Sequence, residues 1–338
     1  MPIKKESNYD LRAHNTFGID VNAELFITYD TVDELVEVLA AVRGNGKRIL
    51  HIGAGSNLLF TSDFEGIILH SGIKFIEHLS RNEQQVIVRA GAGVVWDDFC
   101  ALMAQNNHYG SENLSHIPGE VGAAAVQNIG AYGVEVESII KQVETIEIAT
   151  GKPRVFQAQQ CHYGYRDSIF KNKLKGQYVV TAVVFSLSTV PKVHLDYGQL
   201  QELRALDAMP SAQAIRDAVI AIRKSKLPEP SELGSAGSFF KNPVVPVNVY
   251  DEIAATYANV PHYVIDGERV KIPAAWLIEQ CGFKGKTHGG AAVYEKQPLI
   301  IVNQGHATPT DIMELAEAVK QSVYNKFKIN IQPEVNYI

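Results

Sequence analysis

Hydrophobic residues in the first half of the chain recur with two spacings, one typical of amphipathic helices and one typical of buried strands. A helix is predicted after Thr31, which forms a capping box with Glu34, and Gly44 ends it. A second helix is predicted by apolar residues on one face: Trp96, Phe99, Leu102 and Met103. Segments rich in β-branched residues predict strands at 48–52, 86–88, 143–148 and 178–187. This pattern indicates an α+β domain that ends near residue 190.

A different pattern begins after residue 210. Ser211 caps a predicted helix with Ile215 and Ile222 on its apolar stripe, and a proline-rich stretch at 224–230 ends it. Beyond that stretch we predict a helix at 273–281, a strand at 299–302 and a helix at 310–327. The sequence contains no internal repeat. We therefore expect a boundary between residues 210 and 230.

The composition is that of an ordinary globular protein. The 338 residues are 46% hydrophobic and 20% charged, and a net charge of −6 argues against non-specific binding to nucleic acid. Cys100, Cys161 and Cys281 lie far apart in the sequence, so we predict neither a disulfide framework nor a metal site. The N-terminus has no signal-peptide pattern, and no stretch approaches the roughly 20 apolar residues that span a bilayer. A cytoplasmic protein is the expectation.

The longest run of small residues lies at 116–133, and a shorter glycine-rich loop lies at 51–60. Glycine and alanine let a backbone approach a ligand closely, and backbone N–H groups in such loops can cradle a pyrophosphate. The short loop alone is more typical of a tight turn between strands. The long segment favours a ligand, because turns rarely need so many small residues in succession. Together the two loops suggest a large phosphate-bearing cofactor.

Two common nucleotide-binding motifs do not explain these loops. After Gly53-Ala54-Gly55 the chain has Leu58 where the dinucleotide fingerprint requires glycine. Gly91-Ala92-Gly93 fails in the same way, with Trp96 at the last position. The sequence contains no P-loop.

Five stretches in a fixed order carry a resemblance to a known family. They are Gly53-Ala54-Gly55-Ser56-Asn57, the stretch 117–133, Tyr163-Gly164-Tyr165-Arg166-Asp167-Ser168, Gly237-Ser238-Phe239-Phe240-Lys241-Asn242-Pro243 and Ala274-Ala275-Trp276-Leu277-Ile278. With these stretches the chain resembles the UDP-N-acetylenolpyruvoylglucosamine reductase (MurB) family, in its longer, type I branch. The likeness runs from Asn15 to Val335, and the motifs are highly specific as a set.

The resemblance implies an α+β fold with a division into three parts. The FAD-binding fold of the vanillyl-alcohol-oxidase (PCMH) type would form two subdomains, followed by a C-terminal α+β substrate-binding domain. The expected boundaries are 1–66 for the first FAD-binding subdomain, with the C-terminal tail packing nearby, 67–215 for the second, and 216–338 for the substrate-binding domain.

The resemblance also implies a reaction. In this family NADPH reduces a non-covalently bound FAD, and the flavin reduces the enolpyruvyl ether of a UDP-sugar to UDP-N-acetylmuramate, a peptidoglycan precursor. Hydride arriving at the β-carbon leaves negative charge at the α-carbon and the carboxylate, so the site needs cationic or hydrogen-bonding groups and an acid. We expect FAD as cofactor, NADPH as co-substrate and the UDP-sugar as substrate. The expected protein is a monomer without nucleic-acid or membrane partners.

The catalytic residues that the resemblance implies are Ser238, as proton donor, and Arg166 and Glu334, which stabilise the enol intermediate. An ionised glutamate would repel an enolate, so we expect Glu334 to be protonated or paired with a cation when substrate is bound. Each residue also has a simpler interpretation. Ser238 could form local hydrogen bonds in a Gly-Ser turn, and Arg166 could form an ion pair with Asp167. Glu334 could be a solvated residue near the end of the chain.

Ligand contacts follow from the same motifs. The implied cofactor contacts are Gly53, Ala54, Gly55, Ser56, Asn57, Ile117, Pro118, Gly119, Gly122, Ala123, Gln127, Asn128, Gly130, Ala131 and Tyr132. The implied substrate contacts are Tyr197, Lys226, Asn242 and Gln297. Lys226 is alternatively a linker lysine, and Gln297 an exposed loop amide. Relatives often have a small hydroxyl residue and a proline where this chain has Ala123-Ala124-Ala125, so backbone contacts to the flavin diphosphate are expected there.

Two other functions remain as alternatives. An FAD-dependent oxidase of the same fold would use O2, and many such oxidases attach FAD through a histidine that follows the glycines of the first loop. The stretch 53–58 contains no histidine. A non-catalytic nucleotide-binding module would be expected to lack Arg166, Ser238 or Glu334, and all three are present.

Overall fold

The computed structural model describes residues 3–205 and 209–338 and divides the chain into two compact units. The first unit is formed by the chain up to Tyr9, by Asn22–Ala54 and by Phe64–Ser225. The second unit is formed by Asp10–Val21, Gly55–Asp63 and Lys226–Ile338. Each unit therefore combines segments that are distant in the sequence. The expected division into three parts stays a prediction.

One sheet of the first unit has four strands in the order β1-β2-β5-β3. These strands are Lys4–Asp10, Asn22–Tyr29, Phe64–Ser71 and Arg48–Ile52. β5 lies parallel to β2 and to β3, with Tyr29 opposite Ser71. α1 (Val32–Val42) buries Leu35 and Leu39 in the same cluster as strand residues, because its apolar side chains share one helical face.

The predicted first helix is confirmed, with one correction at its N-terminus. Thr31 Oγ1 accepts a hydrogen bond from the N–H of Glu34 at 3.1 Å. The Glu34 carboxylate accepts from the N–H of Asp30, at 2.7 Å, where the predicted capping box requires the N–H of Thr31. The cap therefore has one of the two expected bonds, and the second bond is shifted by one residue.

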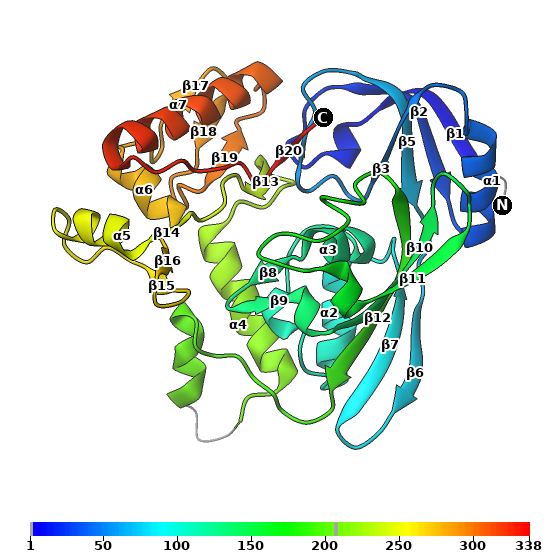
Figure 1. Ribbon diagram of the computed structural model, residues 1–338, viewed down its shortest axis with the longest axis horizontal. Coiled ribbons are helices and arrows are strands. Elements are labelled where there is room, and N and C mark those ends of the chain that lie inside the picture. The colour runs from blue at the N-terminus through cyan, green and yellow to red at the C-terminus, as the bar shows by residue number, and fades with distance from the viewer. Residues whose placement is uncertain (1–2, 206–208) are drawn as a thin grey trace. The chain divides into compact units, whose positions relative to one another are not determined.

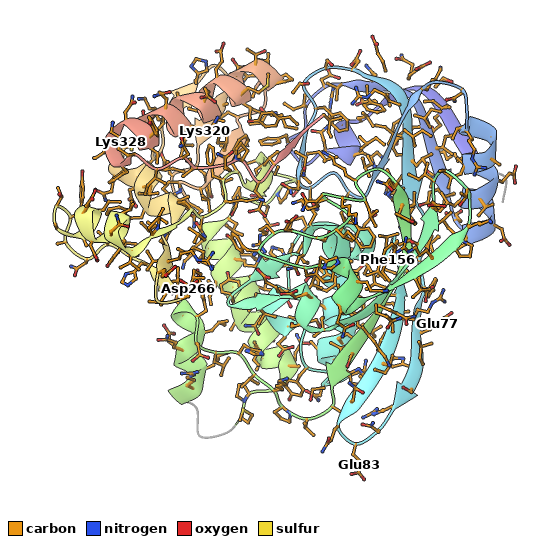
Figure 2. The ribbon with its side chains drawn as sticks, in the orientation of Figure 1. Glu77, Glu83, Phe156, Asp266, Lys320 and Lys328 are labelled. Carbon is orange, nitrogen blue, oxygen red and sulfur yellow. The ribbon has the colours of Figure 1, made fainter. Side chains whose placement is uncertain are left out.

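The second sheet of the first unit is antiparallel, in the order β11-β10-β12-β7-β6 (Figure 1). Its strands are Pro153–Gln157, Ile140–Glu147, Tyr178–Ser188, Gln85–Gly91 and Ile76–Arg81. α2 (Trp96–Gln105) and α3 (Val121–Gln127) share a buried core with this sheet. Phe156 lies in that core, whereas Glu83 projects from the turn between β6 and β7 (Figure 2). The strands predicted at 86–88 and 178–187 fall inside β7 and β12.

Shorter elements complete the first unit. They are the hairpin of β8 (Gly130–Ala131) and β9 (Val134–Glu135), helix α4 (Ala212–Lys226), and the 3-10 turns η2 (Glu112–Leu114), η3 (Val136–Ser138), η4 (Ala158–Cys161) and η5 (Gly198–Ala205). Asn113 donates from its side-chain amide to the carbonyls of Tyr132, at 3.2 Å, and His194, at 2.8 Å. This buried amide therefore connects the glycine-rich segment to the chain that precedes Tyr197.

The second unit is built on two further sheets. The first has the order β13-β19-β18-β17, with strands Gly234–Ser238, Ile300–Asn303, Ala291–Val293 and Thr287–His288. The second has the order β14-β16-β15, with strands Val244–Pro246, Arg269–Lys271 and Tyr263–Val264. The parallel pair β4 (Leu58–Leu59) and β20 (Asn336–Tyr337), the 3-10 turn η1 (Arg12–His14), and the helices α5 (Val247–Ala254), α6 (Ala274–Gln280) and α7 (Pro309–Phe327) complete the unit. The three elements predicted beyond residue 270 match α6, β19 and α7 to within two residues at each end. Within the described residues, none of the helices combines the length and apolar character needed to cross a membrane.

A partly buried ion pair connects α4 to α2 in the first unit. The Arg216 guanidinium donates to both carboxylate oxygens of Asp97, at 2.5 and 2.8 Å. Asp97 also accepts from the N–H of His116. Burial alone would raise the pKa of Asp97, but the hydrogen bonds from Arg216 and His116 hold that pKa below its ordinary value.

This pair makes a prediction about stability and pH. A carboxyl whose pKa is lowered by folding stabilises the fold above its unfolded pKa, and that contribution is lost as the pH falls through the folded pKa. Asp97→Asn is expected to lose about 2 kcal/mol of unfolding free energy at pH 7. Its stability should fall less steeply than that of wild type below about pH 4. Urea unfolding across this pH range measures both effects.

The neighbouring Asp98 lies exposed on the same helix and provides the control. Asp98→Asn should change stability by no more than about 0.5 kcal/mol. An Asp97→Asn variant with the acid sensitivity of wild type would contradict the assignment.

Candidate active site

The two glycine-rich segments approach each other in the first unit. A Cβ atom placed on Gly53 would lie 3.0 Å from Oε2 of Glu120 and 3.4 Å from Cβ of Ala123. Gly53 follows β3, and Ala123 lies in α3. Residues 70 positions apart in the sequence are thus in close contact, as a single cofactor site built from both segments requires.

Glycines also allow α3 to lie close to the end of β7. A Cβ atom on Gly122 would lie 2.9 Å from Cβ of Ala92, and the N–H of Gly122 donates to the Ala92 carbonyl at 2.9 Å. On either side of Ala92, a Cβ on Gly91 or Gly93 would lie within 2.4 Å of a backbone oxygen. The loop Gly91-Ala92-Gly93 is therefore explained by close packing.

Most of the predicted cofactor contacts are accessible. Twelve of the fifteen are partly or fully exposed: Gly53, Ala54, Ser56, Asn57, Ile117, Pro118, Gly119, Ala123, Gln127, Gly130, Ala131 and Tyr132. The buried three are Gly55, Gly122 and Asn128. Accessible backbone flanked by small side chains suits a diphosphate, so the residues present fit the predicted FAD.

Arg166 lies in a tight turn of the first unit. The turn is closed by reciprocal backbone hydrogen bonds between Gly164 and Asp167, at 3.1 and 2.9 Å, and Arg166 has a left-handed φ of +55°. Its Nη2 donates to the Gly130 carbonyl at 2.5 Å. The Asp167 carboxylate is bound by the side-chain amide of Asn172, at 2.7 and 2.8 Å. The arginine is therefore fixed against the second glycine-rich segment.

Ser238 and Glu334 lie on neighbouring segments of the second unit. Ser238 is exposed at the end of β13, opposite Ile300 of β19. The next residue, Phe239, is fully buried, and its carbonyl accepts from the N–H of Glu334 at 2.8 Å. The Glu334 carbonyl in turn accepts from Asn57 Nδ2 at 3.3 Å. Glu334 is half-buried with its backbone held on both sides, which differs from the solvated position that its sequence context suggests.

The predicted substrate contacts are spread over several elements. Lys226 is exposed at the end of α4. The Gln297 carbonyl accepts from Ile300, the strand partner of Ser238, at 3.0 Å. Asn242 Oδ1 accepts from the first N–H of α6 at 2.9 Å, so this side chain also has a structural role. Tyr197 is exposed, and its ring packs edge-on against Tyr132 in the first unit, with 5.8 Å between centroids.

One cation near the glycine-rich segment was not predicted from the sequence. Arg223 of α4 donates from Nε to the His116 carbonyl at 3.1 Å. Burial raises the pKa of the Tyr132 hydroxyl, and the nearby Arg223 guanidinium opposes that rise. The contact joins residues that are 107 positions apart in the sequence. The one sequence feature that could have predicted it is an arginine on the partly apolar face of a helix.

Comparison with known proteins identifies two regions of the chain. Residues 23–157 match the model of an FAD binding domain, and residues 229–338 match that of the UDP-N-acetylenolpyruvoylglucosamine reductase C-terminal domain. Proteins named UDP-N-acetylenolpyruvoylglucosamine reductase from Bacteroides fragilis and Porphyromonas gingivalis are 51% and 44% identical to this chain. The alignments cover 98% of this chain and 100% and 98% of the relatives.

A solved structure shows the same fold. The crystal structure of UDP-N-acetylenolpyruvylglucosamine reductase (MurB) from Thermus caldophilus superimposes with a TM-score of 0.67 at 22% identity. The match covers 100% of this chain and 99% of that one. The predicted α+β FAD-binding fold with a C-terminal domain is confirmed.

The first glycine loop gives a prediction about folding. Gly55 has a φ of +67°, and a Cβ on it would lie 1.8 Å from the His14 carbonyl oxygen in the second unit. Gly55→Ala is therefore expected to lose more than about 2 kcal/mol of unfolding free energy, from backbone strain and steric overlap together. Urea denaturation measures the loss.

Gly46→Ala is the matched control. Gly46 has a similar φ of +74°, but no atom lies within 4 Å of the added Cβ. This variant should lose only about 1 kcal/mol of unfolding free energy, the cost of placing a side chain on a left-handed backbone. Equal losses for the two variants would show that the contact with His14 does not matter.

Proposed function

Because this chain belongs to the UDP-N-acetylenolpyruvoylglucosamine reductase family, we propose that it reduces the enolpyruvyl ether of UDP-N-acetylglucosamine enolpyruvate to UDP-N-acetylmuramate in peptidoglycan precursor synthesis. It is an oxidoreductase with FAD as cofactor and NADPH as co-substrate. The observation that carries the function is 51% identity over nearly the whole length of both chains. When bound, FAD supplies the hydride that originates from NADPH.

We assign the catalytic roles to Arg166, Ser238 and Glu334. The substrate acquires negative charge at the α-carbon and its carboxylate, and the permanently charged Arg166 fork suits that carboxylate. The Ser238 hydroxyl gives its proton to the α-carbon, and its exposed position at the end of β13 supports this role. Glu334 is protonated or paired with a cation in the complex, since an ionised carboxylate would repel the enolate. The backbone pairing of residues 239 and 334 supports a joint role for the last two.

The cofactor is held by the twelve accessible residues of the glycine-rich segments. Small side chains at Gly53, Ala54 and Ala123 leave their backbone open to the diphosphate. Three of the predicted contacts are buried: Gly55, Gly122 and Asn128. We propose that these residues fix the conformation of the glycine-rich segments. The stretch 53–58 has no histidine, which supports non-covalent binding.

The substrate contacts proposed here are Lys226, Asn242, Gln297 and Tyr197. Lys226 is an exposed point charge suited to a diphosphate. Gln297 lies in the turn before Ile300, the residue that pairs with Ser238, which supports a contact near the reacting group. The exposed Tyr197 ring suits a cover for the bound sugar.

We further propose a cytoplasmic monomer with no nucleic-acid or membrane partner, and the division 1–66, 67–215 and 216–338. The net charge of −6 supports the absence of nucleic acid. The three widely separated cysteines support a reducing compartment.

A redox experiment separates the reductase from an oxidase of the same fold. The purified protein should be yellow, and NADPH should bleach it under anaerobic conditions. The reduced protein should regain its colour rapidly on addition of the enolpyruvyl UDP-sugar and slowly in air. Absorbance of the flavin follows each step. Prompt recolouring by air with no response to the UDP-sugar would favour the oxidase, and a protein that binds no FAD would refute both.

Ser238→Ala tests the proposed proton donor. Removing the hydroxyl should leave reduction by NADPH within about twofold of wild type. Oxidation of the flavin by the enolpyruvyl substrate should slow by at least about 100-fold, the lower end of what a positioned general acid contributes. Anaerobic stopped-flow absorbance measures the two half-reactions separately. Ser231→Ala, which changes an exposed serine of the same segment, is the control and should match wild type. Equal losses in both half-reactions would show that Ser238 has a different role.

A further inference from the structure

Asn128 is fully buried at the end of α3, and both the nitrogen and the oxygen of its side-chain amide form hydrogen bonds. Its Nδ2 donates to the Gly164 carbonyl and to Oε2 of Glu135, each at 2.9 Å. Its Oδ1 accepts from the N–H of Glu137 at 3.1 Å. Although the family resemblance implies a cofactor contact at this position, the amide is directed to three protein groups.

One of these bonds holds the turn that carries Arg166. Gly164 is the first residue of that turn, and Asn128 fixes its carbonyl. Beyond the turn, Ser168 Oγ donates to the Val126 carbonyl at 2.6 Å. The turn is thus fastened at both ends to the last residues of α3.

The other two bonds hold the segment on which the Arg166 guanidinium rests. Gly130 and Glu135 are paired in the β8–β9 hairpin, and Asn128 binds the Glu135 side chain. Arg166 Nη2 donates to the Gly130 carbonyl, and a Cβ on Gly130 would lie 2.6 Å from Nη1. Asn128 therefore connects the turn from which Arg166 originates to the hairpin against which its guanidinium lies.

We infer that Asn128 is a positioning residue for Arg166, which fixes the guanidinium for the substrate carboxylate. This inference rests on the proposed catalytic role of Arg166. A displacement of about 1 Å at a catalytic group can lower a rate by about 100-fold. The left-handed φ of +55° at Arg166 makes the turn dependent on such external bonds, because L-residues with side chains disfavour that conformation.

The test uses Asn128→Gly, since glycine tolerates the φ of +46° at this position and lacks the amide. Oxidation of the reduced flavin by the enolpyruvyl UDP-sugar should slow by about 10- to 100-fold. Reduction by NADPH and the Kd for FAD should each change by less than about threefold. A loss of FAD affinity with equal slowing of both half-reactions would overturn the inference in favour of a cofactor contact.

Asn172→Ala is the matched control, because Asn172 binds the same turn from the exposed side through Asp167. It should leave both half-reactions within about twofold of wild type. A loss as large as that of Asn128→Gly would overturn the specific role of Asn128.

A double-mutant cycle separates positioning from a general structural role. In an Arg166→Ala background, Asn128→Gly should slow oxidation of the reduced flavin by the UDP-sugar by less than about a further twofold, since residues that act through one another are not additive. Multiplicative losses would overturn the inference. Glu135→Ala, which removes the carboxylate that Asn128 binds on the hairpin, should give the same pattern and replaces Asn128→Gly if that variant does not fold. A wild-type protein that the UDP-sugar does not oxidise would refute the proposed function itself, whereas an active wild type with a multiplicative cycle refutes the role of Asn128 alone.

Discussion

The second compact unit depends on close approach between backbones that are distant in the sequence. The chain at residues 14–17 passes so near Gly55 and Gly234 that a Cβ on either glycine would lie within 2.3 Å of a carbonyl oxygen. Such contact is possible only without a side chain. It allows the N–H of Ser235 to bind the Thr16 carbonyl at 2.9 Å, and so fixes the start of β13. The position of Ser238, four residues after Gly234, follows from this constraint.

The same constraint fixes the segment that carries Glu334. Phe239 and Phe240 are buried directly after Ser238, and their backbone pairs with residues 333 and 334. The following strand β20 pairs with β4, which begins three residues after Gly55. Three segments from different regions of the sequence therefore form one framework. This framework carries the side chains of Ser238 and Glu334, which are two of the proposed catalytic residues. Its hydrogen bonds hold the backbone at both residues.

Carboxylates in the first unit have local hydrogen-bond partners where the glycine-rich segments meet. Glu120 precedes α3 and contacts Gly53, which places a buried carboxylate beside residues proposed to hold a diphosphate. His70 Nε2 lies 3.0 Å from that carboxylate and so provides a hydrogen-bond partner. The partly buried Asp97 carboxylate is instead paired with the Arg216 guanidinium. Carboxylates removed from water need such partners because an unpaired polar group is costly in a protein interior.

The sequence predicts the local elements well, because periodicity and capping are local properties. Helices α1, α6 and α7 and strands β7, β12 and β19 lie where the apolar pattern places them. The predicted hydrogen-bond donor to the Glu34 carboxylate is wrong by one residue, because several backbone N–H groups lie within reach of one glutamate. The pairing of residues 239 and 334 depends on a contact across 95 positions, which no local pattern encodes. For the same reason, the motif that contains Asn128 identifies a site but does not reveal which atoms the amide binds.

Backbone strain in the first unit has a functional interpretation. Nine non-glycine residues in the described chain have a left-handed φ, and five of them lie between 116 and 166: His116, Asn128, Tyr132, His162 and Arg166. Each such residue costs about 1–2 kcal/mol and persists only where surrounding contacts fix it. A glycine at position 166 would relieve the backbone strain, but it would also remove the guanidinium. The arginine side chain is therefore needed at a position where the backbone conformation disfavours any side chain. The hydrogen bonds around the turn offset that cost, and they give the cation a fixed position before the substrate arrives.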